Sequence, residues 1–197
     1  MTLVLASTSP WRAEMLRNAG VEIECVAPGV DEEEMKLAMR AEGVLARDQA
    51  DALAEMKARR VSARLPGALV LGADQILDFK GEAFDKPITR VAARETLLRL
   101  RGERHELLSA AVIAQDGAPI WRHVGRARLF MRPFTEAFLD DYLNRIGEDA
   151  LRTPGAYMLE GLGAQLFARI DGDYFTVLGL PLIETLGFLR VRGVLTE

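Results

Sequence analysis

LVLASTSPWR, residues 3–12, decides how the fold begins. The four apolar residues at its start, Leu3–Ala6, predict a short buried strand. Ser9 is a favoured helix cap, and Pro10 suits the first helical position because its missing N–H would have no partner there. The chain therefore opens with a strand, a polar turn and a helix.

The same turn gathers groups that bind anions. Hydroxyl groups, free backbone N–H groups, a helix N-terminus and Arg12 occur within six residues of Ser7, so together they could hold a phosphate. The alternative is that Ser9 only caps the helix while Arg12 faces water. The turn taken alone does not decide between the two.

Working outward, strands and helices alternate without repeats, linkers or low-complexity segments. This mixed order predicts one α/β domain, residues 1–197, around one sheet. The predicted elements are a strand at 21–27, two helices within 32–64 that break near Gly43 and end by Pro66-Gly67, a buried strand at 68–71, a hairpin turn at Lys80-Gly81, a helix from Thr89 to Arg101, strands 105–114 and 120–132 paired around Asp116-Gly117, a helix from Thr135 to Gly147, a strand near 166–170 and a helix after Pro181.

Composition and charge exclude several classes of protein. The 197 residues are 49% hydrophobic and 27% charged, which is ordinary for a globular protein and excludes disordered and fibrous chains. The 25 basic and 29 acidic residues give a net charge of −4, which argues against a general polynucleotide or membrane-surface binder. A phosphate ligand would need a local basic pocket.

Cysteine and histidine are too scarce for a structural zinc site. The one cysteine, Cys25, forbids an internal disulfide, and only His105 and His123 could add metal ligands, so any metal must be held by oxygen. We interpret both histidines as structural and Cys25 as a small apolar filler. With no leader-like N-terminus and no long apolar stretch, the sequence predicts a cytoplasmic protein.

Two acidic segments could supply catalytic or metal-binding oxygens. Residues 72–75, Gly-Ala-Asp-Gln, follow the predicted strand 68–71, so Asp74 would lie at a strand end, where α/β sheets place ligands. The alternative is an Asp that only forms a turn. Residues 31–34, Asp-Glu-Glu-Glu, could bind Mg²⁺ or Mn²⁺, or could merely favour the start of a helix.

Lysine is rare, because only four of the 25 basic residues are Lys. Lys57 and Lys86 could bind phosphate as compact point charges, although most lysines are simply solvated. A last candidate is the segment 160–164, Glu-Gly-Leu-Gly-Ala, in which glycines would let Glu160 approach a ligand; its alternative is an ordinary turn.

Taken together, six segments in register resemble the Maf family over nearly the whole chain. They are LASTSPWR (5–12), VDEE (30–33), LGADQ (71–75), DKP (85–87), LRGERHE (100–106), and GAYMLEGLGA (155–164) followed by GDYFTVLGLPL (172–182). The resemblance implies a nucleoside triphosphate pyrophosphatase that releases a nucleoside monophosphate and pyrophosphate with a divalent cation, Mg or Mn. It also implies an elongated, mixed central sheet flanked by helices, like that of inosine triphosphate pyrophosphatases, and a homodimer.

The family's site residues carry over by position. Asp74 matches the proton acceptor for the attacking water and a metal contact, and Glu32 matches a second acid at the metal. The phosphate-binding positions fall on Ser7, Arg12, Lys57 and Lys86.

Three positions at which this sequence departs from the commonest family pattern indicate the nucleobase of the substrate. Trp11, Gln75 and Glu160 stand where that pattern has Arg, Thr and Gln, and this combination resembles the branch that prefers 7-methyl-GTP. A carboxylate can accept both N–H groups of the guanine edge, and Trp offers a face to a cationic base.

Two alternatives stay open at this point. One is a pyrophosphatase that prefers dTTP, UTP or CTP. The other is a nucleotide-binding regulator of cell division with little turnover. Asp85 before Lys86, and Thr153-Pro154 before Gly155, also depart from the usual pattern and could weaken phosphate attraction.

Overall fold

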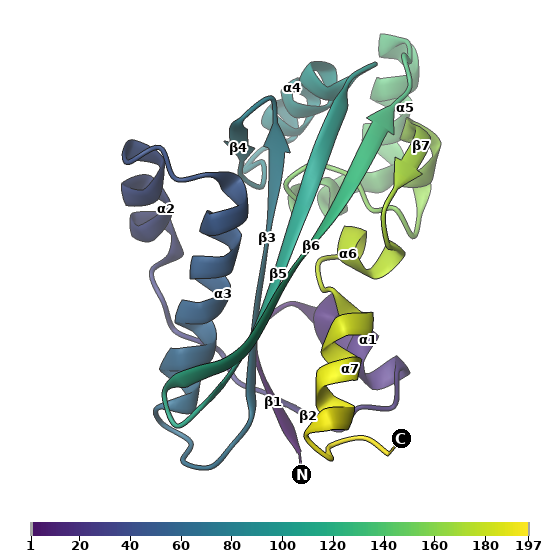
Figure 1. Cartoon of the computed structure of the whole chain (residues 1–197). Coiled ribbons are helices and arrows are strands. Elements are labelled where there is room, and N and C mark those ends of the chain that lie inside the picture. The colour runs from purple at the N-terminus through teal and green to yellow at the C-terminus, as the bar shows by residue number, and fades with distance from the viewer. Residues whose placement is uncertain (1, 197) are drawn as a thin grey trace. The chain divides into compact units, whose positions relative to one another are not determined.

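A computed structural model describes residues 2–196, in which strands and helices alternate as predicted (Figure 1). The strands are β1 (Leu3–Ala6), β2 (Ile23–Cys25), β3 (Val70–Phe79), β4 (Glu82–Phe84), β5 (Arg104–Gln115), β6 (Ala118–Met131) and β7 (Phe167–Asp171). The helices are α1 (Pro10–Asn18), α2 (Glu32–Ala41), α3 (Ala46–Ser62), α4 (Arg90–Leu100), α5 (Glu136–Ile146), α6 (Tyr174–Leu178) and α7 (Leu182–Val191), with short 3-10 helices η1 (Gly147–Leu151) and η2 (Leu162–Leu166).

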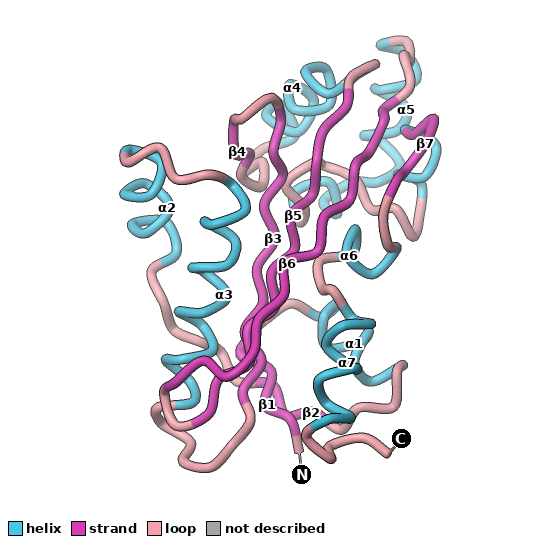
Figure 2. Tube along the Cα trace, in the orientation of Figure 1, coloured by secondary structure: helices cyan, strands magenta, loops and turns pink. Residues whose placement is uncertain are grey.

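The strands form a mixed sheet, which confirms the predicted α/β class. Its order is β2-β1-β3-β5-β6-β7, with β4 paired to β3. β1 runs parallel to both neighbours, whereas β4 and β7 are antiparallel to β3 and β6. Figure 2 shows β4 beside the second half of β3. No helix within the described residues is both long enough and apolar enough to cross a membrane.

The chain divides into two compact units. The first unit contains the residues up to Gln75, Leu108–Gly125 and the residues from Asp173 onward, and the second contains Ile76–Leu107 and Arg126–Gly172. The long strands β3, β5 and β6 contribute one part to each unit. The prediction of one domain over 1–197 stays a prediction.

The core of the first unit follows from the two-residue period of its strands. Leu3 and Leu5 of β1 pack with α1 and α7, whereas Val4 and Ala6 pack with Val61 of α3. Alternate residues of a strand point to opposite faces, so one apolar run buries both faces. α1 and α7 therefore cover one face and α3 the other (Figure 1).

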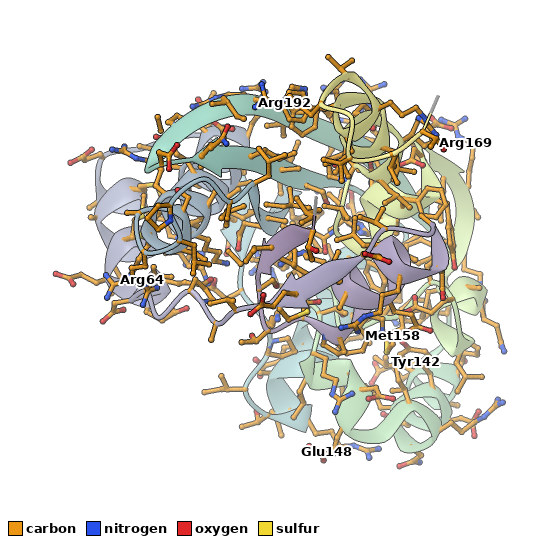
Figure 3. All side chains as sticks on the ribbon, turned by 90° about the horizontal axis from the view of Figure 1, so that it is seen from below. Arg64, Tyr142, Glu148, Met158, Arg169 and Arg192 are labelled. Atoms are coloured by element: carbon orange, nitrogen blue, oxygen red, sulfur yellow. The ribbon has the colours of Figure 1, made fainter. Side chains whose placement is uncertain are left out.

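Two long side chains tie loops of the first unit to its framework; both are labelled in Figure 3. Arg64, just beyond α3, donates to the Pro28 carbonyl oxygen at 3.2 Å. Arg192, just beyond α7, donates to Gln115 Oε1 at 3.0 Å.

The helix caps confirm the opening of the chain. The Ser9 side chain accepts from the Arg12 backbone N–H, and Pro10 occupies the first helical position of α1. Thr89 and Thr135 likewise cap α4 and α5. Local capping chemistry thus placed three helix starts correctly.

The prediction that a strand ends before Asp74 is wrong. β3 continues to Phe79 because its second half pairs with β4, through a turn in which Lys80 and Gly81 have φ values of 56° and 89°. The neighbouring strand β1 is the one that ends here, with Ala6 opposite Gly72. Asp74 therefore lies inside a strand, just past the end of its neighbour.

Two other boundaries differ from the prediction, and one helix was not predicted. β2 spans three residues rather than 21–27 because it pairs only with the short β1, at Leu3, Val4 and Leu5. α3 ends at Ser62, before Pro66. The helix α6 was not predicted, since five residues are too few to show a helical period.

In the second unit His105 belongs to a buried polar pair, as we expect of a structural histidine. His105 is 1% exposed, and its Nε2 lies 2.7 Å from the hydroxyl oxygen of Tyr157. Tyr142, labelled in Figure 3, donates to the Ala156 carbonyl oxygen at 3.1 Å. Burial lowers the pKa of His105 to about 4, so the ring is neutral near pH 7.

We predict a pH-dependent loss of stability from this histidine. Because the pKa in the folded protein lies below the ordinary value of 6.5, the contribution is complete above pH 6.5 and is lost as the pH falls toward 4. Between about pH 7.5 and pH 5 the loss should be about 2 kcal/mol. Urea unfolding of the parent and of His105→Gln at both pH values measures it. Equal pH dependence in the two proteins would contradict the assignment.

Candidate functional site

The position of α3 against β3 depends on Gly72. A β-carbon placed on Gly72 would lie 2.2 Å from the Ala54 carbonyl oxygen and 2.6 Å from the Ala58 backbone nitrogen. Only glycine allows the helix backbone to approach the strand this closely. Asp74, two residues further along β3, points to the same face, and Lys57 comes from the adjacent part of α3.

The close approach of α3 to β3 brings a lysine and two carboxylates together. Lys57 Nζ lies 2.6 Å from Asp74 Oδ1 and 2.9 Å from Glu32 Oε2. Lys57 and Asp74 are 5% and 6% exposed, and Glu32, the first residue of α2, is half-buried. The lysine is therefore not a solvated surface residue but the shared partner of two acids.

The other members of the acidic segment have local roles. The Asp31 side chain caps α2 by accepting from the Glu34 backbone N–H at 3.1 Å. Glu33 pairs with Lys36 at 2.9 Å on the surface of the helix. Of the acids in this segment, Glu32 is the one that contacts Lys57. Asp31 and Glu33 agree with the alternative interpretation, in which the acidic segment favours the start of a helix.

Ser7 and Arg12 form the second part of the site. Ser7 is buried just past the end of β1, and its Oγ accepts from Ser9 N–H at 3.1 Å and from Arg12 Nη1 at 3.5 Å. Arg12 Nε donates to the Gly179 carbonyl oxygen at 2.9 Å. The guanidinium is thus held by the protein rather than extended into water.

The charges of the two parts influence one another. Burial lowers the pKa of Arg12, while the negative charges of Asp74 and Glu32 act to raise it. These carboxylates therefore lie within electrostatic reach of Arg12. Five predicted site residues of the first unit gather past the end of β1: Ser7, Arg12, Glu32, Lys57 and Asp74.

Gln75, next to Asp74, points to the opposite face of β3 and is tied to α6. Its Nε2 lies 2.9 Å from Ser109 Oγ and donates to the carbonyl oxygens of Thr176 and Val177 at 3.1 and 3.0 Å. The amide group predicted to contact a base therefore already holds protein acceptors. Trp11, the other residue of the first unit assigned to the nucleotide base, is partly buried on α1.

The two remaining predicted residues belong to the second unit. Lys86 follows β4 and is exposed, and Glu160 is exposed in the loop before η2. That loop is tight, because a β-carbon on Gly163 would lie 2.4 Å from the Met158 carbonyl oxygen. Glycine here thus allows the close return of the backbone that presents Glu160.

Sequence reasoning missed Ser109, Thr176 and Gly179. Ser109 is fully buried within β5, where it interrupts an otherwise apolar run from Leu107 to Ala114. A lone polar residue in such a run needs a partner, which was the available signal. Thr176 and Gly179 lie in a segment that carried the family resemblance without an assigned role.

The donor set limits how a metal could be held. Among residues 2–196 no group of three or more His, Cys, Asp or Glu side chains is arranged around one point. Two carboxylates, from Glu32 and Asp74, do converge on one position, which the Lys57 ammonium fills. Mg²⁺ is commonly bound by one or two carboxylates together with substrate phosphates, so this pair fits such an ion.

Comparisons with known proteins identify the family of the chain. The model of a family described as Maf-like protein matches residues 2–192. A nucleoside triphosphate pyrophosphatase of Hyphomonas neptunium is 54% identical over 195 residues, which cover 99% of this chain and 98% of that protein. Proteins with the same name from Caulobacter vibrioides and Roseobacter denitrificans are 55% and 53% identical, covering 98% and 97% of this chain and 97% and 96% of their own lengths.

We predict that Gly72→Ala destabilises the protein by about 1–3 kcal/mol, because the new β-carbon would overlap backbone atoms of α3. Urea unfolding measures the change. Gly187→Ala in α7 is the matched control, because a β-carbon there meets nothing within 4 Å. Replacing this helix-interior glycine with alanine should not lower the stability of the protein. Equal stability of the two variants would contradict the packing argument.

Proposed function

The chain belongs to the Maf family, and on that premise we propose that it is a nucleoside triphosphate pyrophosphatase. It hydrolyses the bond between the α and β phosphates and releases a nucleoside monophosphate and pyrophosphate. One observation carries the proposal: a buried carboxylate, a second acid and two cations gather past the end of β1. Such a set can both activate water and neutralise phosphate charge.

Asp74 is the proposed proton acceptor. Its Oδ1 contacts Lys57 Nζ at 2.6 Å, so a neighbouring cation holds the carboxylate in place. Burial limits exchange with bulk water, and the strand fixes the direction of the carboxylate. A side chain held in this way can orient one water molecule and accept its proton.

Glu32 and Asp74 would hold the divalent cation, Mg or Mn. Both oxygens already point to one cation, the Lys57 ammonium. When bound, such an ion neutralises phosphate charge and lowers the pKa of coordinated water. Lys57 would offer its Nζ to a phosphate oxygen, since its side chain ends in three rotatable donors.

The polyphosphate is bound by Ser7, Arg12, Lys57 and Lys86. Arg12 has N–H groups left after its Nε contact with Gly179, and a guanidinium binds phosphate through two parallel hydrogen bonds. Among residues 2–196 the Arg12 guanidinium forms no close ion pair, which leaves its charge for the substrate.

The base that we propose is 7-methylguanine. Trp11 supplies an aromatic face for the positive charge of the methylated ring, and Glu160 supplies two acceptors for the N–H groups of the guanine edge. Gln75 completes the set, and its Nε2 contacts with α6 leave Oε1 as the atom able to face a ligand.

Asp74→Asn tests the enzyme directly. We expect turnover to fall by about 10²–10⁴, because the amide cannot accept the proton, while nucleotide binding is retained. Pyrophosphate release and equilibrium binding, both with Mg²⁺ or Mn²⁺, measure the two properties. An unchanged rate would exclude Asp74 as the base, and a parent protein that binds but never turns over would favour the regulator.

A panel of nucleotides tests which nucleobase the protein prefers. The parent protein should hydrolyse 7-methyl-GTP faster than UTP, dTTP or CTP at equal subsaturating concentrations, and Glu160→Gln should lower its preference for 7-methyl-GTP over UTP by about tenfold. Glu148→Gln is the control, since Glu148 is an exposed acid of the same unit (Figure 3). A parent that favours UTP, or an unmoved preference in Glu160→Gln, would overturn the assignment.

A further inference from the structure

The side chain of Arg12 is oriented by a single backbone carbonyl. Its Nε donates to Gly179 at 2.9 Å, whereas its contact with Ser7 Oγ, from Nη1, is long at 3.5 Å. The five N–H groups of a guanidinium lie in one rigid plane, so a fixed Nε–H direction fixes where the terminal N–H groups point. The position of the Gly179 carbonyl therefore sets the orientation of Arg12.

Gly179 ends α6 in a conformation that favours glycine. Its φ is +108°, in the left-handed region, and its N–H donates to the Phe175 and Thr176 carbonyl oxygens at 3.1 and 3.2 Å. A β-carbon there would lie 3.7 Å from both Arg12 Nη2 and Gln75 Oε1. The residue thus combines a required turn with close contact to both side chains.

α6 cannot hold this geometry alone, because an isolated helix of five residues is unstable. Asp173 caps its start by accepting from the backbone N–H groups of Phe175 and Thr176 at 3.2 and 2.7 Å. Its other end needs partners from outside the helix. Figure 2 shows α6 as one short turn between loop segments.

Two strand residues supply those partners. Ser109 Oγ of β5 donates to the Thr176 carbonyl oxygen at 2.7 Å, and Gln75 Nε2 of β3 donates to the Thr176 and Val177 carbonyl oxygens. Ser109 Oγ also accepts from Gln75 Nε2 at 2.9 Å. The Thr176 side chain is buried against Gly125 of β6, where a β-carbon would lie 2.5 Å from Thr176 Oγ1.

We propose that Ser109 and Gln75 are positioning residues for Arg12, acting through α6 and the Gly179 carbonyl. The inference rests on the proposed phosphate-binding role of Arg12. Ser109 is fully buried, and it holds the Thr176 carbonyl oxygen in the helix that leads to Gly179. Gln75 acts on Arg12 by the same path, because its Nε2 donors hold α6. The segment GDYFTVLGLPL, residues 172–182, thereby gains a role in binding the anionic part of the substrate.

Ser109→Ala tests the proposal, with Ser62→Ala as the matched control. Ser62 is also fully buried in the first unit, and its Oγ contacts the Arg59 carbonyl oxygen and the Gly117 N–H, outside this network. The probe is inorganic pyrophosphate, titrated by calorimetry. Ser109→Ala should weaken its binding about fivefold, and the Ser62 variant less than twofold.

A double-mutant cycle separates positioning from general loss of stability. In an Arg12→Ala background, Ser109→Ala should change pyrophosphate affinity less than twofold, because the residue through which it acts is absent. Equal effects of Ser109→Ala in the two backgrounds would overturn the proposal while leaving the proposed function intact. Gln75→Met, which removes the donors and keeps an unbranched side chain of similar length, is the second variant if Ser109→Ala does not fold.

A spectroscopic readout is independent of function. The ¹⁵N-labelled Arg12 Nε–H signal, assigned by its absence in Arg12→Lys, should shift and exchange faster with water in Ser109→Ala but not in Ser62→Ala. If the parent neither binds pyrophosphate nor hydrolyses nucleotides, the proposed function fails, yet this signal still decides whether Ser109 orients Arg12. An unmoved signal would refute the inference.

Discussion

The buried ammonium of Lys57 between two carboxylates is the interaction on which the first unit's site depends. Two acids that converge on one position would repel one another without a cation, and a buried lysine without partners would leave an uncompensated charge in the protein interior. The three side chains come from α2, α3 and β3, so their contact also joins these elements. This contact requires glycine at position 72, which lets α3 lie close to β3. One missing β-carbon thus connects packing to chemistry.

The site's cations are held by the protein before any substrate arrives. Lys57 is held by acids that also suit a divalent ion, and Arg12 by a backbone carbonyl. The two cations differ in how freely they can change their contacts. Lys57 can exchange its partners when the charge at the site changes, whereas Arg12 keeps its orientation because its Nε contact does not compete with phosphate. A net charge of −4 is therefore compatible with a local site for a highly anionic ligand.

Features governed by local chemistry were predictable from the sequence. Ser9 and Pro10 marked the start of α1, Asp116-Gly117 marked the hairpin, and the polar turn at Ser7 indicated which side chains gather beside Arg12. What depends on distant partners was not. The length of β3 follows from pairing with β4, and the contacts of Gln75 join residues more than 100 positions apart, at Thr176 and Val177. No pattern within a local window contains such pairs.

In the proposed hydrolysis, water attacks the α phosphate and pyrophosphate leaves. ³¹P NMR of the products formed from a nucleoside triphosphate in ¹⁸O-labelled water measures this outcome. We expect equimolar nucleoside monophosphate and pyrophosphate, with the label in the monophosphate. Nucleoside diphosphate with inorganic phosphate, or label in the pyrophosphate, would contradict it.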